Sequence, residues 1–261
     1  MKIRGIIDVL EGIAPLKYQE SYDNSGLISG DPETDCTGVL IALDCTEELV
    51  REAIEKKLNL IVTHHPLIFR PIHSLVNDTA VGRCLMEAVR HNIIIYAIHT
   101  NLDNMIHGVN ATIADRLNLV NRSVLKPQSD NLSVGAAMLG NLTKPVDEGA
   151  FLSLLREKFH SKMIRHSALT GRPVLRVAVC GGSGSSLISN ALAARADFFV
   201  TADLKYHDFA EAEGRLVIAD IGHFESEQFT TDLIYDLIHE KFPTFAVLKS
   251  GMETNPVHYY I

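Results

Sequence analysis

The chain has 261 residues, of which 46% are hydrophobic, and its 24 Lys and Arg against 32 Asp and Glu give a net charge of −8. This composition excludes a disordered or fibrous protein, and the length predicts about two domains whose cores need no disulfide or structural metal. The acidic balance argues against a nucleic-acid partner, because sequence-independent binding needs Lys and Arg to displace counterions from phosphates.

The four cysteines and the N-terminus bear on the compartment. Cys36, Cys45, Cys84 and Cys180 are scattered without a CxxC pair, which predicts reduced thiols. No run approaches the roughly eighteen apolar residues of a membrane span, and the N-terminus lacks the apolar region of a signal peptide. We therefore expect a cytoplasmic protein with no membrane segment.

The first half of the chain alternates apolar runs with helical patterns. Residues 38–43, 58–62 and 92–98 are continuous, β-branched runs, which are typical of buried parallel strands. Residues 46–57 and 78–91 between them have helical periodicity, and Thr46 is a predicted N-cap. Strand, helix, strand, helix, strand is the order of an α/β layer.

The second half continues in the same way. Residues 132–142 predict a strand, residues 147–158 predict a helix, and a turn follows at residues 171–173. Three more strands are predicted at 174–179, 196–200 and 216–221, separated by helical stretches at 185–195 and 205–213. A last helix over 225–241 and a strand over 244–249, with a sheet edge as one option for its position, complete the pattern.

The two halves share a spacing. Asp44, after the first strand, precedes Thr63 by 19 residues, and Gly182 precedes Thr201 by the same interval, so both pairs are offset by 138 positions. We therefore predict the α/β class with two related lobes, residues 1–125 and 126–261, and residues 225–261 able to pack back on the first lobe. No low-complexity linker separates the lobes, which favours packed rather than independent lobes.

Potential metal ligands follow the predicted strands. Twelve histidines are about twice what average composition supplies. His64 and His65 come directly after a strand, and Pro66 keeps the chain extended there. Because ligands bind at the carboxyl ends of parallel strands, these imidazoles are candidate ligands, with two histidines at a surface turn as the alternative.

Two further strand ends carry the same kinds of side chain. The third strand of the first lobe leads to His99 and Asp103, and that of the second lobe leads to His223 and Glu227. If a helix has begun by His223, then His223 and Glu227 are at i and i+4 and share a face. For Glu227 alone, a charge in the first turn of a helix is the alternative.

Together these positions predict a dinuclear site. Three imidazoles and two carboxylates exceed the needs of one ion, whereas two ions about 3.5–4 Å apart would use them all. Such ligands suit two divalent ions chosen from Zn, Fe, Mn, Co or Ni. The predicted metal ligands are His64, His65, Asp103, His223 and Glu227.

Other residues are candidates for supporting roles. Asp44, Asn101 and His99 could orient metal-bound imidazoles, although an ordinary loop position is an equal alternative for Asp44. Asp23 and Asn24 could reach the site, but their Asn-Ser-Gly context favours a turn. Two more groups of residues have both a functional and a structural interpretation. Lys205, Tyr206 and His207 could bind a substrate anion or lie on a helix surface, and glycines 181, 182 and 184 could cradle an anion or form a tight turn.

Four motifs resemble one known family. The THHP of residues 63–66, the HTNLD of residues 99–103 and the GHxxSE of residues 222–227, with the DNSGL of residues 23–27, are similar to the Nif-three-like dinuclear metal family. That family is often labelled GTP cyclohydrolase I type 2 homologue. The resemblance covers essentially the whole chain and implies a metal pair between two lobes and assembly into a toroidal hexamer.

The resemblance also implies roles for the ligands. His65 and Asp103 would hold one ion, His64 and His223 the other, and Glu227 would bridge them. A metal pair activates water and stabilises a developing oxyanion, so a metal-dependent hydrolase acting on a nucleotide or another small metabolite is expected. If the label applies, the reaction is ring opening of GTP, with His99 as the candidate proton donor. The alternative is a non-catalytic, metal-binding regulatory or adaptor protein, since nothing in the sequence specifies a guanine pocket.

Overall fold

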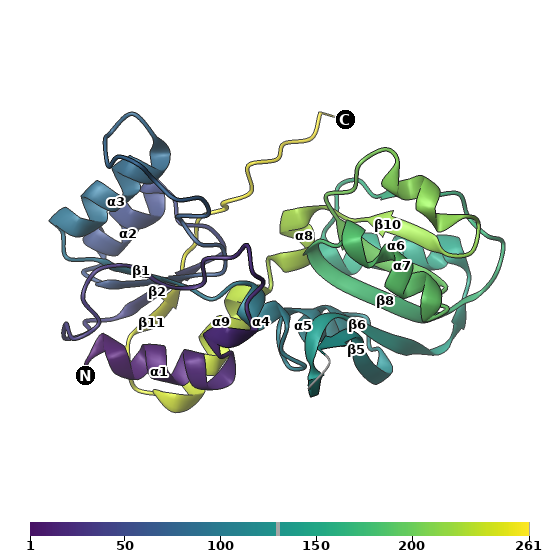
Figure 1. Cartoon of the computed structure of the whole chain (residues 1–261), viewed down its shortest axis with the longest axis horizontal. Helices are drawn as coiled ribbons and strands as arrows, with labels where there is room; N and C mark the ends of the chain where they lie inside the picture. Colours follow the sequence, from purple (N-terminus) through teal and green to yellow (C-terminus); the bar gives the residue numbers. More distant parts are fainter. Residues whose placement is uncertain (129–130, 261) are drawn as a thin grey trace. The chain divides into compact units, whose positions relative to one another are not determined.

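The computed structural model describes residues 1–128 and 131–260, and the chain divides into two compact units. Unit 1 comprises Met1–Leu102 and Thr230–Val257, and unit 2 comprises Asp103–Phe229 and His258–Ile261. Each unit is built on its own sheet with helices packed against it (Figure 1). The predicted α/β class with two lobes is therefore confirmed.

The sheet of unit 1 has the order β1-β4-β3-β2-β11 among the described residues. Strands β2, β3, β4 and β11 run parallel, and β1 is antiparallel to β4. Three predicted strands are confirmed as β2, β3 and β4, and the predicted C-terminal strand lies at a sheet edge as β11. The strand bounds are β1 Gly26–Ser29, β2 Val39–Ala42, β3 Leu60–Thr63, β4 Ile94–Ala97 and β11 Val247–Lys249.

Helices cover both faces of this sheet, with α2 and α3 on one face and α1 and α9 on the other (Figure 1). Every residue of β2, β3 and β4 is buried, which explains why these strands are continuous apolar runs rather than alternating ones. The Thr46 hydroxyl accepts a hydrogen bond from the amide of Leu49 at 3.2 Å, so the predicted N-cap of α2 is confirmed. The helix bounds are α1 Ile3–Ile13, α2 Glu47–Glu55, α3 Ala80–Arg90, α4 Thr100–Asp103 and α9 Thr230–Lys241, with a short 3-10 helix at Leu16–Tyr18.

The sheet of unit 2 has the order β5-β6-β8-β9-β10-β7 in the described ranges. Its strands β8, β9 and β10 are parallel neighbours and correspond to the three strands predicted for the second half. Antiparallel strands flank them on both sides. The bounds are β5 Val120–Gln128, β6 Asn131–Val146, β7 Arg165–His166, β8 Val174–Ser183, β9 Phe198–Ala202 and β10 Val217–Asp220.

Unit 2 also has helices on its sheet. The Asp147 carboxylate accepts hydrogen bonds from the amides of Gly149 and Ala150 and so caps α6, which packs through Phe151 against Phe198 of β9 at a ring-centroid distance of 4.9 Å. The helix bounds are α5 Val109–Arg116, α6 Glu148–Phe159, α7 Ile188–Ala193 and α8 His223–Glu227, with 3-10 helices at Ser185–Leu187 and Asp208–Ala212.

The internal repeat appears in the strand register. Val39 of β2 pairs with Leu60 of β3, and the residues 138 positions later, Val177 and Phe198, pair with each other in β8 and β9. In both units the third parallel strand is flanked by a short antiparallel strand, β1 or β7, and runs directly into a short helix, α4 or α8. The two lobes are therefore related in topology as well as in sequence spacing.

Two predicted helices differ from those observed. The helix predicted over 225–241 is two helices, because the Gln228 side chain donates to the carbonyl of Phe159 and the Phe229 ring packs against Arg116. These anchors hold residues 228–229 on unit 2, whereas α9 belongs to unit 1. The helix predicted over 205–213 is a short 3-10 helix, in which the Asp208 carboxylate accepts from the amide of Lys205. Within the described ranges, every helix falls short of the combined length and apolarity that crossing a bilayer takes.

Candidate functional site

Three histidines of unit 1 form a group where β3 and β4 end. The ring centroids of His64, His65 and His99 lie 5.0–5.3 Å apart. One ligand nitrogen from each lies within 4.8 Å of the other two, so the group could hold a metal ion. β3 ends at Thr63, so the chain has left the sheet at the two adjacent histidines, and a ligand nitrogen of each lies within 4.8 Å of the other.

The Nδ1 atom of each of the three imidazoles lies within hydrogen-bond distance of an oxygen acceptor. The Nδ1 of His64 lies 2.9 Å from the carbonyl of Ile98, that of His65 lies 2.7 Å from Asp44, and that of His99 lies 2.8 Å from Asp23. Because a carbonyl can only accept, the Nδ1 of His64 carries a proton and donates it to the Ile98 carbonyl. A metal-ligating imidazole needs this tautomer, and acceptors at the second nitrogen are typical of metal sites.

Asp23 has a larger role than its turn motif suggested. Its carboxylate accepts hydrogen bonds from the Ser25 hydroxyl at 2.8 Å, from the amide and hydroxyl of Thr100 at the start of α4, and from His99. Burial alone would raise the pKa of Asp23, but the hydrogen bonds from His99, Thr100 and Ser25 prevail and hold that pKa well below its usual range. Asp23 therefore stays ionised and orients His99 while it caps α4.

Asp44 and Asn101 hold the group in place in different ways. One oxygen of Asp44 accepts from His65, and the other accepts from the Thr254 hydroxyl at 3.2 Å. Of the two roles predicted for Asp44, these contacts favour orientation of an imidazole over an ordinary loop position. The buried Asn101 side chain accepts from the backbone amide of His99 and donates to the carbonyl of Ala14. Asn101 thus positions the backbone of His99 rather than an imidazole ring.

Removing the Asp44 carboxylate should weaken metal binding without removing a ligand. We expect Asp44→Ala to lower metal affinity by about 10- to 100-fold, because the ring of His65 loses the acceptor that fixes its tautomer. Metal titrations followed by calorimetry measure the effect. The matched control is Asp8→Ala on the exposed face of α1, and equal affinities in the two variants would contradict an orienting role for Asp44.

Unit 2 carries a second set of donors at the start of α8. His223 is the first residue of this helix, and its Nε2 lies 2.9 Å from the Glu227 carboxylate, so the predicted i, i+4 pair shares a face. The Nδ1 of His223 lies 2.6 Å from the carboxylate of Asp203. His223 is therefore the fourth of the candidate site imidazoles whose Nδ1 lies within hydrogen-bond distance of an oxygen acceptor.

Two carboxylates surround His223. Burial by itself would lower the pKa of His223, but the charges and hydrogen bonds of Glu227 and Asp203 raise it to about 11. The hydrogen bond from His223 in turn lowers the pKa of Asp203. A group of this kind favours a positive charge at its centre, and the imidazolium proton supplies that charge in the absence of a metal ion.

The last residues of β8 leave room for this pair. A Cβ added to Gly182 would lie 2.4 Å from Glu227 Oε1 and 3.2 Å from His223 Cε1, and Gly182 has a φ of +58°. The amide of Gly181 donates to Asn110 and that of Gly182 donates to the Ser226 hydroxyl. These amides therefore bond to side chains of α5 and α8 rather than to an anion, and Gly181 and Gly182 belong to strand β8 instead of a tight turn.

Asp103 and Glu227 both lie near Cys180. Burial, together with the charges of Asp103 and Glu227, raises the pKa of the Cys180 thiol. The backbone carbonyl of Asp103 accepts from the Asn110 side chain at 3.1 Å. In unit 2, His223 thus pairs with Glu227, and Asp103 and Glu227 both lie near Cys180, while unit 1 brings together His64 and His65 with His99.

One orienting residue escaped the sequence analysis. Asp203 lies 138 positions after His65, so the repeat spacing places it at the position equivalent to a predicted ligand. A single Asp, however, does not by itself indicate a metal site. The neighbouring Lys205, Tyr206 and His207 are exposed in the turn before a 3-10 helix, which fits the surface alternative.

Sequence comparisons match the whole chain to one family. The model of the Duf34/NIF3 (NGG1p interacting factor 3) family matches residues 1–256. A GTP cyclohydrolase 1 type 2 homolog of Clostridium perfringens is 35% identical over 228 residues, which cover 87% of each chain. A protein of the same description from Campylobacter jejuni is 30% identical over 262 residues and covers 100% of each chain.

Solved structures agree with this match. A Bacillus cereus protein related to NIF3 has a TM-score of 0.94 and 24% identity, covering 100% of this chain and 99% of that chain. A hypothetical protein of Staphylococcus aureus has a TM-score of 0.91 and 29% identity over the same shares. The resemblance inferred from the four motifs is confirmed, and the chain belongs to the Duf34/NIF3 family.

Proposed function

We propose that this chain is a metal-dependent hydrolase that holds two divalent ions and acts on a nucleotide or another small metabolite. The proposed ligands are His64, His65, Asp103, His223 and Glu227, with the ion chosen among Zn, Fe, Mn, Co and Ni. The observation that carries the proposal is the shared arrangement of four imidazoles, whose Nδ1 atoms all lie on oxygen acceptors. An acceptor at Nδ1 is typical of imidazoles that bind metal through Nε2.

The chemistry of the donors suits the proposed ions. Neutral imidazole and carboxylate ligands suit borderline transition metals. When bound, the ions would supply Lewis-acid activation of water and would stabilise negative charge developing on the substrate. Asp44, Asp23 and Asp203 would keep the rings of His65, His99 and His223 in fixed tautomers.

His99 is the proposed proton-transfer residue. Its Nδ1 is held by the ionised Asp23, so its Nε2 is the atom that can take up and release a proton. The side chain lies in the same group as His64 and His65, within reach of a substrate held there. We expect His99→Gln to lower turnover while leaving the metal content intact.

Metal binding should release a proton from His223. With a pKa near 11 the metal-free imidazole is protonated at neutral pH, and a ligand nitrogen must lose its proton, so affinity should rise with pH by about tenfold per unit below that pKa. Calorimetric titration with Mn²⁺ in buffers of different ionisation enthalpy counts the protons, and we expect about one per ion bound through His223.

A variant of the neighbouring carboxylate provides the control for this count. Asp203→Asn removes one of the two charges that raise the pKa of His223, so the pH above which the affinity stops rising should be lower in this variant. Metal uptake without proton release in the wild-type protein would contradict the assignment.

The test of the activity compares metal-loaded protein with a ligand variant. Wild type and Glu227→Gln are incubated with GTP and with a panel of phosphoesters, and product formation is followed by chromatography. Turnover by wild type that is lost in the variant supports a hydrolase. Equal background from both proteins would favour a metal-binding regulatory or adaptor protein instead.

Assembly and location complete the proposal. The family resemblance favours a toroidal hexamer, and light scattering coupled to gel filtration measures the mass directly. The four free cysteines favour the reducing environment of the cytoplasm.

A further inference from the structure

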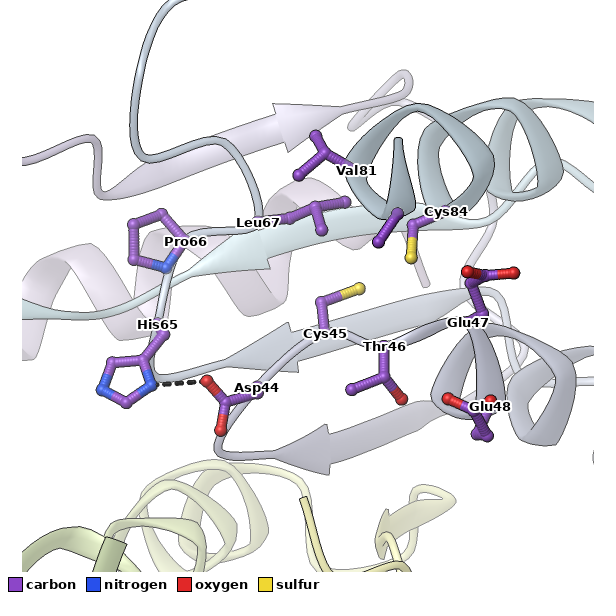
Figure 2. Close-up of a pocket in the computed structure, with 11 residues that line it drawn as sticks. Asp44, Cys45, Thr46, Glu47, Glu48, His65, Pro66, Leu67, Val81 and Cys84 are labelled. Atoms are coloured by element: carbon purple, nitrogen blue, oxygen red, sulfur yellow. Dashed lines mark hydrogen bonds and ion pairs between the residues drawn. The ribbon is translucent and has the colours of Figure 1, made fainter. Parts of the chain in front are cut away.

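Unit 1 contains a pocket of about 340 Å³ beside His65 (Figure 2). It lies between the segment that follows β2 and the segment that leads from β3 to the first turns of α3. The residues that line it are Asp44, Cys45, Thr46, Glu47, Glu48, His65, Pro66, Leu67, Ala80, Val81 and Cys84.

The position and size of the pocket are those of a binding site. It opens at the carboxyl ends of two neighbouring parallel strands, which is where ligands bind in open α/β sheets. His65 and the Asp44 carboxylate that orients it form one end, so a group in the pocket would extend from a proposed metal ligand. The volume is near the lower end of the range for small-molecule sites, roughly 300–1,000 Å³, and suits one compact group rather than a whole nucleoside triphosphate.

The walls of the pocket are mainly apolar. Leu67 and Val81 face it from one side, and the sulfur atoms of Cys45 and Cys84 point into it from two different segments (Figure 2). Burial raises the pKa of Cys84 to about 11 and that of Cys45 further, so both thiols are neutral. A neutral buried thiol behaves as a small apolar group.

The charges at the pocket are of one sign. Asp44, Glu47 and Glu48 line it, and none of its described lining residues is Lys or Arg. Arg83 and Arg51 pair with Glu47 and Glu48 at 2.8 and 3.5 Å, but both arginines lie outside the lining. These ion pairs reduce the negative charge without offering a cation to a ligand.

The first turn of α2 offers no anion site either. Its Leu49 amide donates to the hydroxyl of Thr46, and Glu47 and Glu48 already place negative charge at this end of the helix. A phosphate would therefore meet carboxylates and an occupied amide, whereas an amine would meet three possible acceptors.

We propose that this pocket is the substrate subsite next to His65 and that it binds a compact apolar group carrying an amine rather than a phosphate. Its role in catalysis rests on the proposed hydrolase function. Binding in the pocket does not depend on a metal ion, because the lining supplies both the apolar walls and the acceptors.

The rates at which the thiols of Cys45 and Cys84 are alkylated report whether the pocket is occupied. Metal-free protein is alkylated with iodoacetamide at about pH 9, and each cysteine is quantified by peptide mass spectrometry. Benzylamine, benzyl alcohol and benzyl phosphate are the probes, since they share one apolar body and differ in charge. Cys36 and Cys180, which lie outside the pocket, report any general change in reactivity.

We expect benzylamine to slow alkylation of Cys45 and Cys84 at concentrations at least tenfold lower than benzyl phosphate, with benzyl alcohol between them. Protection by the phosphate at equal or lower concentration, equal protection by the alcohol and the amine, or protection by none of the three would overturn the proposal. Metal content is measured separately, so a failure of this inference is distinct from a failure of the proposed function.

Two variants test the site of binding. Val81→Phe fills the pocket and should abolish protection, whereas Val89→Phe, at an exposed position on the same helix, should leave it unchanged. Glu48→Gln keeps the exposed rim in shape and should reduce the preference for the amine over the phosphate. Undiminished protection in a folded Val81→Phe variant, or an unchanged preference in Glu48→Gln, would place the probe elsewhere.

Discussion

Glu227→Gln should lower the affinity for the proposed metal ions by at least about 100-fold. Loss of an orienting residue around a metal costs roughly 10- to 100-fold, and a directly bound carboxylate contributes at least the upper end of that range. The Glu227 side chain is only 3% exposed and accepts from His223 in the absence of a metal ion. A Gln amide keeps the shape and one acceptor oxygen, so the helix should remain folded.

Metal analysis by plasma emission after dialysis measures the loss, and circular dichroism verifies the fold. Glu240→Gln, at a solvent-exposed position of α9, is the matched control and should retain the full metal content. Full occupancy of Glu227→Gln at the same free metal concentration would refute the proposed ligand set.

Gly182→Ala should weaken metal binding without replacing a proposed ligand. The added methyl group would lie 2.4 Å from Glu227 Oε1, a distance that no relaxed structure tolerates, so the carboxylate must leave its place beside His223. We expect the affinity to fall by at least about tenfold, since displacement of a ligand costs no less than loss of its supporting contacts. The experiment is a metal titration, with the thermal midpoint recorded for each protein.

The chain offers a control with the same backbone cost. Gly171 also has a positive φ, +72°, but a Cβ there would meet nothing within 4 Å. Alanine at either position should cost about 1 kcal/mol of stability from the left-handed backbone. Only Gly182→Ala should lose metal; equal metal affinity in the two variants would show that the close approach of Gly182 has no bearing on the site.

Much of the fold followed from local patterns. The continuous apolar runs at 38–43 and 58–62 predicted buried strands because each is covered on both faces, and the structure has β2 and β3 there. The spacing of 138 residues predicted a register that the pairs Val39–Leu60 and Val177–Phe198 share. Helix α1 was not predicted, although Ile3, Ile6 and Leu10 have the spacing of one buried helical face.

The candidate site also has a part that the sequence predicts and a part that it does not. Histidines after strand ends, and a His and a Glu four residues apart, are features of short segments, so the sequence was enough to predict candidate ligands. Their partners are distant in the chain: Asp44 lies 21 residues before His65, and Asp23 lies 76 residues before His99. No periodicity reports such a pairing.

By itself, then, the amino-acid sequence determined the strands, the repeat, the family and the residues available as metal ligands, because these depend on near neighbours in the chain and on motif order. Only the tertiary structure decided which nitrogen of each imidazole is occupied, why Gly182 must lack a side chain, and where the final helical stretch breaks. Each of these depends on the distance between atoms that folding brings together from remote segments, and burial and charge then set their protonation.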